Sequence, residues 1–221
     1  MLFIFGFLFP VEDLGADDEG GLAIKKIRLT AAGNGGPGFT LLDSRNHQVN
    51  FENKLEQAAW LNNQNLLNGS GVALGDFDRD GHCDIYLCSL SGSNRLYRNL
   101  GGWRFSDATS SDVACQGVYS TGAGFADLNG DGWLDLFVAS YDATLADVCA
   151  DHLGQEFRAH PPSLFHNRGD GTFEDVASSH GLDHAWLPMG ANFGDLDNDG
   201  WPDTYLATGD PDRKSTRLNA S

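Results

Sequence analysis

A nine-residue acidic loop that occurs three times constrains the fold of this chain more than any other feature. The copies, at residues 76–84, 127–135 and 195–203, read DFDRDGHCD, DLNGDGWLD and DLDNDGWPD. In each copy an oxygen-bearing side chain stands at positions 1, 3, 5 and 9, and glycine stands at position 6. We refer to them as the first, second and third acidic loops. A polar turn rich in Asp and Gly would explain one copy, but not three in the same register.

This spacing is typical of a calcium cage. A hard divalent cation takes six to eight oxygen ligands, and a short loop turns several carboxylates inward only by curling sharply. Glycine at position 6 permits the positive φ of such a turn, and position 7 varies because it contributes only its backbone carbonyl. Without a cation the carboxylates would repel one another. The sequence therefore predicts about three Ca²⁺ sites, with ligands from Asp76, Asp78, Asp80, His82, Asp84, Asp127, Asn129, Asp131, Trp133, Asp135, Asp195, Asp197, Asp199, Trp201 and Asp203.

An EF-hand begins with a similar loop, but its loop ends on a bidentate Glu at position 12 and lies between two helices. Position 12 is Leu87, Val138 or Leu206 here. The residues after each loop read IYLC, LFVA and TYLA, and such β-branched and aromatic residues favour a strand. The EF-hand interpretation therefore fails.

A larger unit repeats around the loops. The segment LYRNLGGWRFSDA at residues 96–108 aligns with LFHNRGDGTFEDV at 164–176 at an offset of 68, which is also the offset between the second and third loops. Each unit reads as a hairpin, a short strand, and then a loop with its own strand. The first and second loops are only 51 residues apart, and the 17-residue difference lies in one insertion at 141–163. Such insertions map to one face of a repeat protein, often the binding face.

The strands after the loops are apolar on both faces, with Ile85 and Leu87 on one and Tyr86 and Cys88 on the other. A strand buried on both sides needs a sheet stacked between neighbouring sheets, as in a propeller blade. Residues 39–68 read as a degenerate first repeat. There Phe51 is expected to fill the packing position that Phe105 and Phe173 fill in the other units, and Asn68-Gly69 is expected to form a tight turn.

The loops, the preceding GVALG, GAGFA and GANFG segments, and the "LYRN…GxxxFxD" hairpins resemble FG-GAP/VCBS repeats. These are the calcium-binding blades of integrin α-subunit propellers and of bacterial proteins similar to cartilage acidic protein. The resemblance covers about residues 39–210, although the Phe-Gly/Gly-Ala-Pro signature is degenerate here. It implies an all-β, seven-bladed propeller of a secreted or surface protein. We expect residues 39–211 to form three to four blades, with the remaining blades absent from this chain.

The charge composition disfavours some classes of binding partner. The formal net charge of −17 argues against nucleic acid or an anionic membrane surface, because both favour a cationic face. Eleven of the 31 acidic residues lie in the three loops, so much of the acidity belongs to the predicted metal sites. The expected partner is a protein or glycan ligand at the cell surface or in the matrix. The expected location is extracellular, at the cell surface or periplasmic.

The two ends read differently from the repeats. Residues 1–38 are expected to be an N-terminal segment or linker with one strand, and the acids at 17–19 lack the alternate spacing of the loops. The apolar run at 1–9 is too short to span a bilayer. It reads equally as a signal-peptide remnant, an edge strand, or a start chosen inside a longer reading frame. Residues 212–221 resemble the translation of a sequencing adapter and are expected to be non-native.

Four cysteines allow three disulfide pairings. Cys83 and Cys88 are an odd number of residues apart on a strand, so their side chains face opposite ways and a bond between them is disfavoured. A Cys115–Cys149 bridge is the favoured pairing, with buried free thiols as the alternative.

No catalytic constellation is present, and a carboxylate that holds Ca²⁺ is a poor general base. We therefore expect a non-enzymatic, calcium-stabilised repeat protein with a structural, adhesion or scaffold role. The alternatives are a propeller-based polysaccharide lyase or a glycan-binding lectin, with a site on the 141–163 loop face. Cys149, His152 and His160 in this insertion are weak candidates for a transition-metal site. Arg168-Gly169-Asp170 spells an integrin-binding tripeptide, but its place in the repeat predicts a hairpin turn.

Overall fold

The structure is a computed structural model that describes residues 11–13, 27–29, 42–188 and 191–206. The chain divides into two units, residues 1–47 and 48–221. In the first unit β1 (Val11–Asp13) and β2 (Ile27–Leu29) pair as an antiparallel ribbon, where the sequence predicted a single strand. The apolar run at 1–9, the acids at 17–19 and the segment 212–221 lie outside the described residues.

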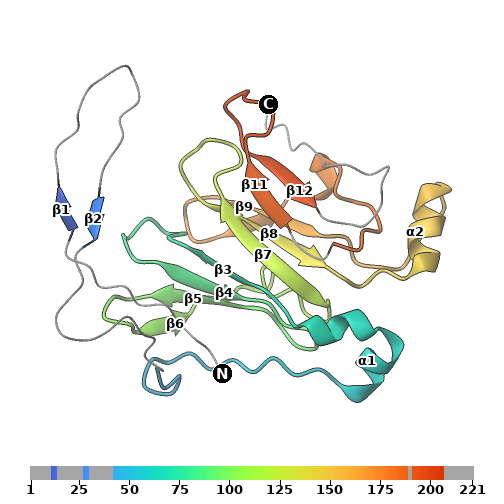
Figure 1. The fold of residues 1–221 in the computed structure, drawn as a ribbon, viewed down its shortest axis with the longest axis horizontal. Helices are drawn as coiled ribbons and strands as arrows, with labels where there is room; N and C mark the ends of the chain where they lie inside the picture. Colours follow the sequence, from blue (N-terminus) through green and yellow to red (C-terminus); the bar gives the residue numbers. More distant parts are fainter. Residues whose placement is uncertain (1–10, 14–26, 30–41, 189–190, 207–221) are drawn as a thin grey trace. The chain divides into compact units, whose positions relative to one another are not determined.

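Antiparallel sheets dominate the second unit (Figure 1). The first sheet has the order β3 (Val72–Gly75), β4 (Asp84–Leu87), β5 (Arg95–Asn99), β6 (Phe105–Asp107). The second has the order β7 (Ser120–Ala126), β8 (Asp135–Ser140), β9 (Ser163–Asn167), β10 (Phe173–Asp175). The third pairs β11 (Ala191–Gly194) with β12 (Asp203–Leu206). Each acidic loop joins the first two strands of its sheet, which confirms the predicted strands and both hairpins. The grouping differs from the predicted unit, because each hairpin pairs with the strands of the preceding loop and not with those of the loop that follows it.

The sheets stack on one another through their faces. In β8 alternate residues enter different clusters: Leu136 and Val138 pack with residues of the first sheet, whereas Phe137 and Ala139 pack with Leu206 of the third. All six residues of β8 and all four of β4 are buried. This confirms for β4 and β8 the prediction that the strands after the loops are covered on both faces. In β12 the prediction is wrong for one face, because Tyr205 is exposed.

The first strands of the sheets approach one another closely, and β7 lies beside both β3 and β11. Glycines allow this approach. A Cβ atom on Gly71 would lie 2.6 Å from the Cα of Gly122, and one on Gly124 would lie 2.4 Å from the Phe193 ring.

The segment before the first sheet differs from its prediction. Within the described residues 42–71 there is no strand, and the chain forms α1 (Gln57–Asn62) and the 3₁₀ helix η1 (Gln64–Asn68) instead. Phe51 is only half-buried, whereas Phe105 and Phe173 are buried. A single aromatic residue at matching spacing is a weak guide, because it lacks the alternating apolar residues that hold a strand in a sheet. The tight turn predicted at Asn68-Gly69 is not formed, because Asn68 is the last residue of η1 and Gly69, with a φ of +91°, follows the end of this helix.

The Cys115–Cys149 bridge is not formed, and all four cysteines are free. Cys115 packs against the cluster between the first two sheets, whereas Cys149 is exposed on α2 (Leu145–His152). Cys88 is fully buried in that same cluster, in agreement with the free-thiol alternative.

The insertion predicted at 141–163 forms an ordered excursion between β8 and β9. Its helix α2 is preceded by the N-cap residue Thr144, which forms a capping box with Asp147. After β10 the chain makes the short 3₁₀ helix η2 (Ser178–His180). Among the described residues, no helix has the length and apolar character needed to cross a membrane.

Candidate metal centre

The three acidic loops share one hydrogen-bonded framework. The position 1 aspartate accepts the backbone N–H of the glycine at position 6 at 2.9 Å in every loop. That glycine has a φ of +87°, +87° and +91° at Gly81, Gly132 and Gly200, as the sequence predicted. The position 5 aspartate accepts the N–H of position 7 in every loop. The loop therefore closes on its own carboxylates.

Position 4 also adopts the left-handed conformation, which the sequence analysis did not predict. Arg79, Gly130 and Asn198 have φ values of +59°, +74° and +59°. Asn tolerates this region well, but Arg does so only at a cost.

The position 9 aspartate anchors each loop to its sheet. Its Oδ2 accepts the N–H of position 2, at 3.0 Å for Asp84, 3.2 Å for Asp135 and 2.9 Å for Asp203. All three residues are buried. Burial raises the pKa of Asp84 to about 6, against the backbone N–H groups of Asn99 and Phe77, which favour the charged form. Burial likewise raises the pKa of Asp135.

An asparagine at the end of the hairpin strand completes the anchor, a role that was not predicted from the sequence. The backbone N–H of Asn99 donates to Asp84 Oδ1 at 2.7 Å, and that of Asn167 donates to Asp135 Oδ1 at 2.9 Å. Each side chain donates to the carbonyl at position 8 of its own loop. Asn167 also donates to the carbonyl of Phe77 in the neighbouring first loop, at 2.8 Å. The signal was present, since this Asn recurs in LYRN and LFHN at the 68-residue offset.

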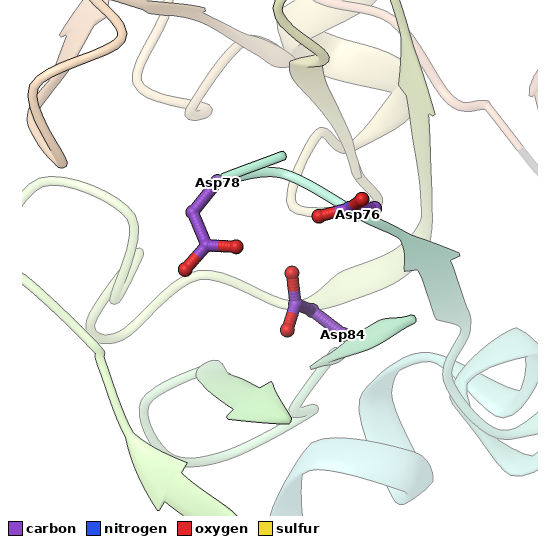
Figure 2. A group of neighbouring side chains, drawn as sticks. All are labelled: Asp76, Asp78 and Asp84. Atoms are coloured by element: carbon purple, nitrogen blue, oxygen red, sulfur yellow. The ribbon is translucent and has the colours of Figure 1, made fainter. Parts of the chain in front are cut away.

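The carboxylates at positions 1, 3 and 9 converge in two of the loops. In the first loop Asp76, Asp78 and Asp84 each place one oxygen within 4.8 Å of the others, and Figure 2 shows the three groups facing a common space. In the third loop Asp195, Asp197 and Asp203 do the same. The position 5 residues Asp80 and Asp199 are not part of these groups. Three hard anionic oxygens at this separation fit a hard divalent cation and do not fit a soft metal.

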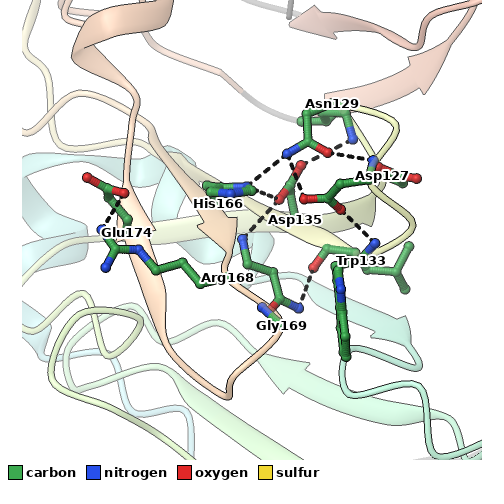
Figure 3. Close-up of polar contacts among 12 residues, drawn as sticks. Asp127, Asn129, Trp133, Asp135, His166, Arg168, Gly169 and Glu174 are labelled. Carbon is green, nitrogen blue, oxygen red and sulfur yellow. Dashed lines mark hydrogen bonds and ion pairs between the residues drawn. The ribbon is translucent and has the colours of Figure 1, made fainter.

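The second loop is arranged differently, as Figure 3 shows. Position 3 is Asn129, whose side chain lies 3.0 Å from both Asp131 Oδ2 and His166 Nδ1. The same His166 nitrogen lies 3.0 Å from Asp135 Oδ1. Asp127 keeps the contact with the position 6 N–H of Gly132, but its second contact is with the position 4 N–H of Gly130, where the first and third loops use the position 5 N–H. The second loop thus has the shared framework, with one fewer carboxylate and an imidazole on its position 9 aspartate.

The first loop has an arginine in the place of this histidine. Arg98 and His166 are 68 residues apart and occupy the fourth positions of β5 and β9. The Arg98 guanidinium forms an ion pair through Nε with Asp78 Oδ2, and a second through a terminal nitrogen with Asp80 Oδ2 at 3.0 Å.

Side chains at position 7 connect each loop to other parts of the structure. The Arg79 guanidinium of the first loop lies 5.2 Å from the centroid of the Trp133 ring of the second. A Cβ atom on Gly130 of the second loop would lie 2.5 Å from the Trp201 ring of the third. The predicted role of position 7 was confined to its backbone carbonyl. Its side chain therefore has a packing role that the prediction did not include.

The other candidates from the sequence contribute less. Arg168-Gly169-Asp170 lies in the β9–β10 turn, which confirms the predicted hairpin turn. In this turn Arg168 pairs with Glu174 at 2.6 Å (Figure 3). His160 lies 2.7 Å from Asp142, and among the described residues Cys149, His152 and His160 form no group able to hold a metal.

Repeated antiparallel sheets, each with an acidic loop between its first two strands, define a class of repeat proteins. Residues 57–138 and 148–206 match the FG-GAP-like repeat family, and the chain belongs to this family. The two matched segments include all three acidic loops. No curated protein matches the chain.

Proposed function

We propose that the chain is a calcium-stabilised FG-GAP repeat domain in which the three acidic loops hold Ca²⁺. The observation that carries the proposal is the convergence of the position 1, 3 and 9 carboxylates within 4.8 Å in the first and third loops. Such carboxylates repel one another unless a cation neutralises them. When bound, the ion would supply charge neutralisation and tie the first two strands of each sheet together.

We further propose that the sheets are propeller blades. Three observations support this arrangement. The strands follow one another in chain order within each sheet, the first strands of the sheets are neighbours, and β8 is packed on both faces. A closed ring of four to eight blades would need further repeats.

A structural role in adhesion or scaffolding, outside the cytoplasm, follows from the proposed metal. Extracellular calcium modules bind with dissociation constants of about 10⁻⁴ to 10⁻³ M, which suits a compartment rich in calcium. The acidic net charge of −17 would disfavour nucleic acid and favour a protein or glycan partner.

Isothermal titration of the calcium-free protein with Ca²⁺ tests the proposal. We expect about three sites in the wild type and the loss of one in Asp197→Ala, which removes a carboxylate from the third loop. Asp112→Ala, at an exposed residue outside the loops, should leave the number of sites unchanged. Absence of calcium-dependent heat in the wild type would refute the proposal.

A further inference from the structure

The first loop differs from the other two in the positive side chains close to its carboxylates. The first loop has four aspartates, and Arg79 at position 4 and the Arg98 guanidinium offset two of these charges, which leaves a net charge of −2. The second has three aspartates, because position 3 is Asn129, the third has four, and neither of these nine-residue loops contains Lys or Arg. The Arg79 guanidinium lies over the Trp133 ring of the second loop, whereas Arg98 pairs with carboxylates of the first loop itself.

The contacts of Arg98 place its charge on the proposed metal ligands themselves. Its Nε pairs with Asp78, whose carboxylate belongs to the converging group of the first loop. Its terminal nitrogen lies 3.0 Å from Asp80, the position 5 carboxylate. A cation that enters between Asp76, Asp78 and Asp84 would be repelled by the Arg98 guanidinium and would compete with it for the Asp78 carboxylate.

We propose that Arg98 pairs with the carboxylates of the first acidic loop in the metal-free protein and thereby lowers the affinity of this loop for Ca²⁺. The inference rests on the proposed calcium function and assigns Arg98 as a residue that sets the affinity of one site. It predicts that the loops differ in their affinity for Ca²⁺ because the side chains around them differ, although the same position 6 hydrogen bond is present in all three.

The position 6 amides offer one reporter for each loop. The N–H groups of Gly81, Gly132 and Gly200 donate to the position 1 carboxylates of their own loops. Ion binding to those carboxylates changes the amide shifts. A Ca²⁺ titration of ¹⁵N-glycine-labelled full chain therefore gives a separate dissociation constant for each loop.

In Arg98→Gln we expect the dissociation constant reported by Gly81 to fall by about tenfold at low ionic strength, because a unit charge near a divalent ion is removed. The constants reported by Gly132 and Gly200 should change less than about twofold. Arg98→Lys retains the charge and should stay near the wild-type value. Arg95→Gln is the matched control, since Arg95 lies on the same strand and pairs with Asp107, outside the loops.

A second measurement covers the metal-free state. With EDTA present, Arg98→Gln should melt about 2 °C below the wild type, because the loop carboxylates lose their counter-charge. Saturating Ca²⁺ should remove most of this difference.

An unchanged or higher Gly81 dissociation constant in Arg98→Gln, with the wild-type loops still binding Ca²⁺, would overturn the inference and leave the proposed function standing. A wild-type titration in which none of the three glycines responds would refute the proposed function itself, and the role of Arg98 with it.

Discussion

At the scale of single residues, the loops depend on aspartates and asparagines that hold backbone groups. The position 9 aspartates are buried and accept N–H groups from the loop and, in the first two loops, from the hairpin. The asparagines at the hairpin ends hold the carbonyls on the other side of the loop. The carboxylates at positions 1, 5 and 9 are therefore oriented by hydrogen bonds to backbone N–H groups.

Replacing Asn167 by Ala tests this role. The side chain is buried and donates to the carbonyls of Phe77 and Leu134, and both carbonyls would lose a donor. We expect unfolding in urea to show a loss of about 2 kcal/mol. Arg168→Ala, at the next residue, breaks an exposed ion pair with Glu174 and should cost less than about 1 kcal/mol. Equal effects of the two substitutions would show that Asn167 is not an anchor.

The raised pKa of Asp84 predicts a pH dependence in the calcium-free protein. Its pKa of about 6 in the folded state lies above the ordinary value of 3.8, so protonation favours the folded state. The stability from this group is fully present below pH 3.8 and is lost as the pH rises through about 6. Relative to Asp84→Asn in EDTA, the wild type should lose on the order of 1 kcal/mol between pH 4 and pH 7. A constant difference across this range would contradict the assignment.

At the scale of elements, stacked sheets place the loops beside one another. The cluster between the first and second sheets and the cluster between the second and third both draw on β8. The contact of Arg79 with Trp133 extends this packing to the loops themselves. Arg79 has a positive φ, which is unfavourable for a residue with a long side chain, and the contact of its guanidinium with the Trp133 ring offsets part of this cost.

A pair of glycines on β7 tests the stacking. A Cβ atom on Gly124 would meet the Phe193 ring at 2.4 Å, whereas one on Gly122 would meet only Ala139, at 3.8 Å. Gly124→Ala should therefore lower the free energy of unfolding by about 2 kcal/mol through overcrowding, and Gly122→Ala should cost much less. Phe193→Leu should recover part of the loss in Gly124→Ala. If both glycines tolerate alanine equally, the third sheet does not pack on β7 in this way.

At the scale of the whole molecule, repetition made the fold predictable. Three loops in register and two aligned hairpins predicted the strands around each loop, and the apolar faces of β4 and β8 predicted the stacking. Which loop each hairpin pairs with was not predictable, because a repeat along the chain does not show where one sheet ends and the next begins. Residues 42–71 were not predictable in this way, because Phe51 alone carried the comparison and local sequence favoured helices. The free cysteines depend on distances between elements, which spacing along the chain does not encode.

The sequence predicted the loop residues of the candidate site, but not the residues of other strands that contact them. The loop aspartates follow from a spacing that can be read along one segment. Arg98, His166 and Asn167 reach the loops from hairpin strands, so their roles emerge only when the sheet is assembled.

The most direct test of the calcium account is a comparison of melting temperature with and without chelation. Each site that is saturated about tenfold above its dissociation constant adds about 1.4 kcal/mol to the folded state. Three such sites should raise the melting temperature by about 10 °C in millimolar Ca²⁺ relative to EDTA, with full recovery when Ca²⁺ is added back. An identical melting temperature in EDTA and in Ca²⁺ would contradict the account.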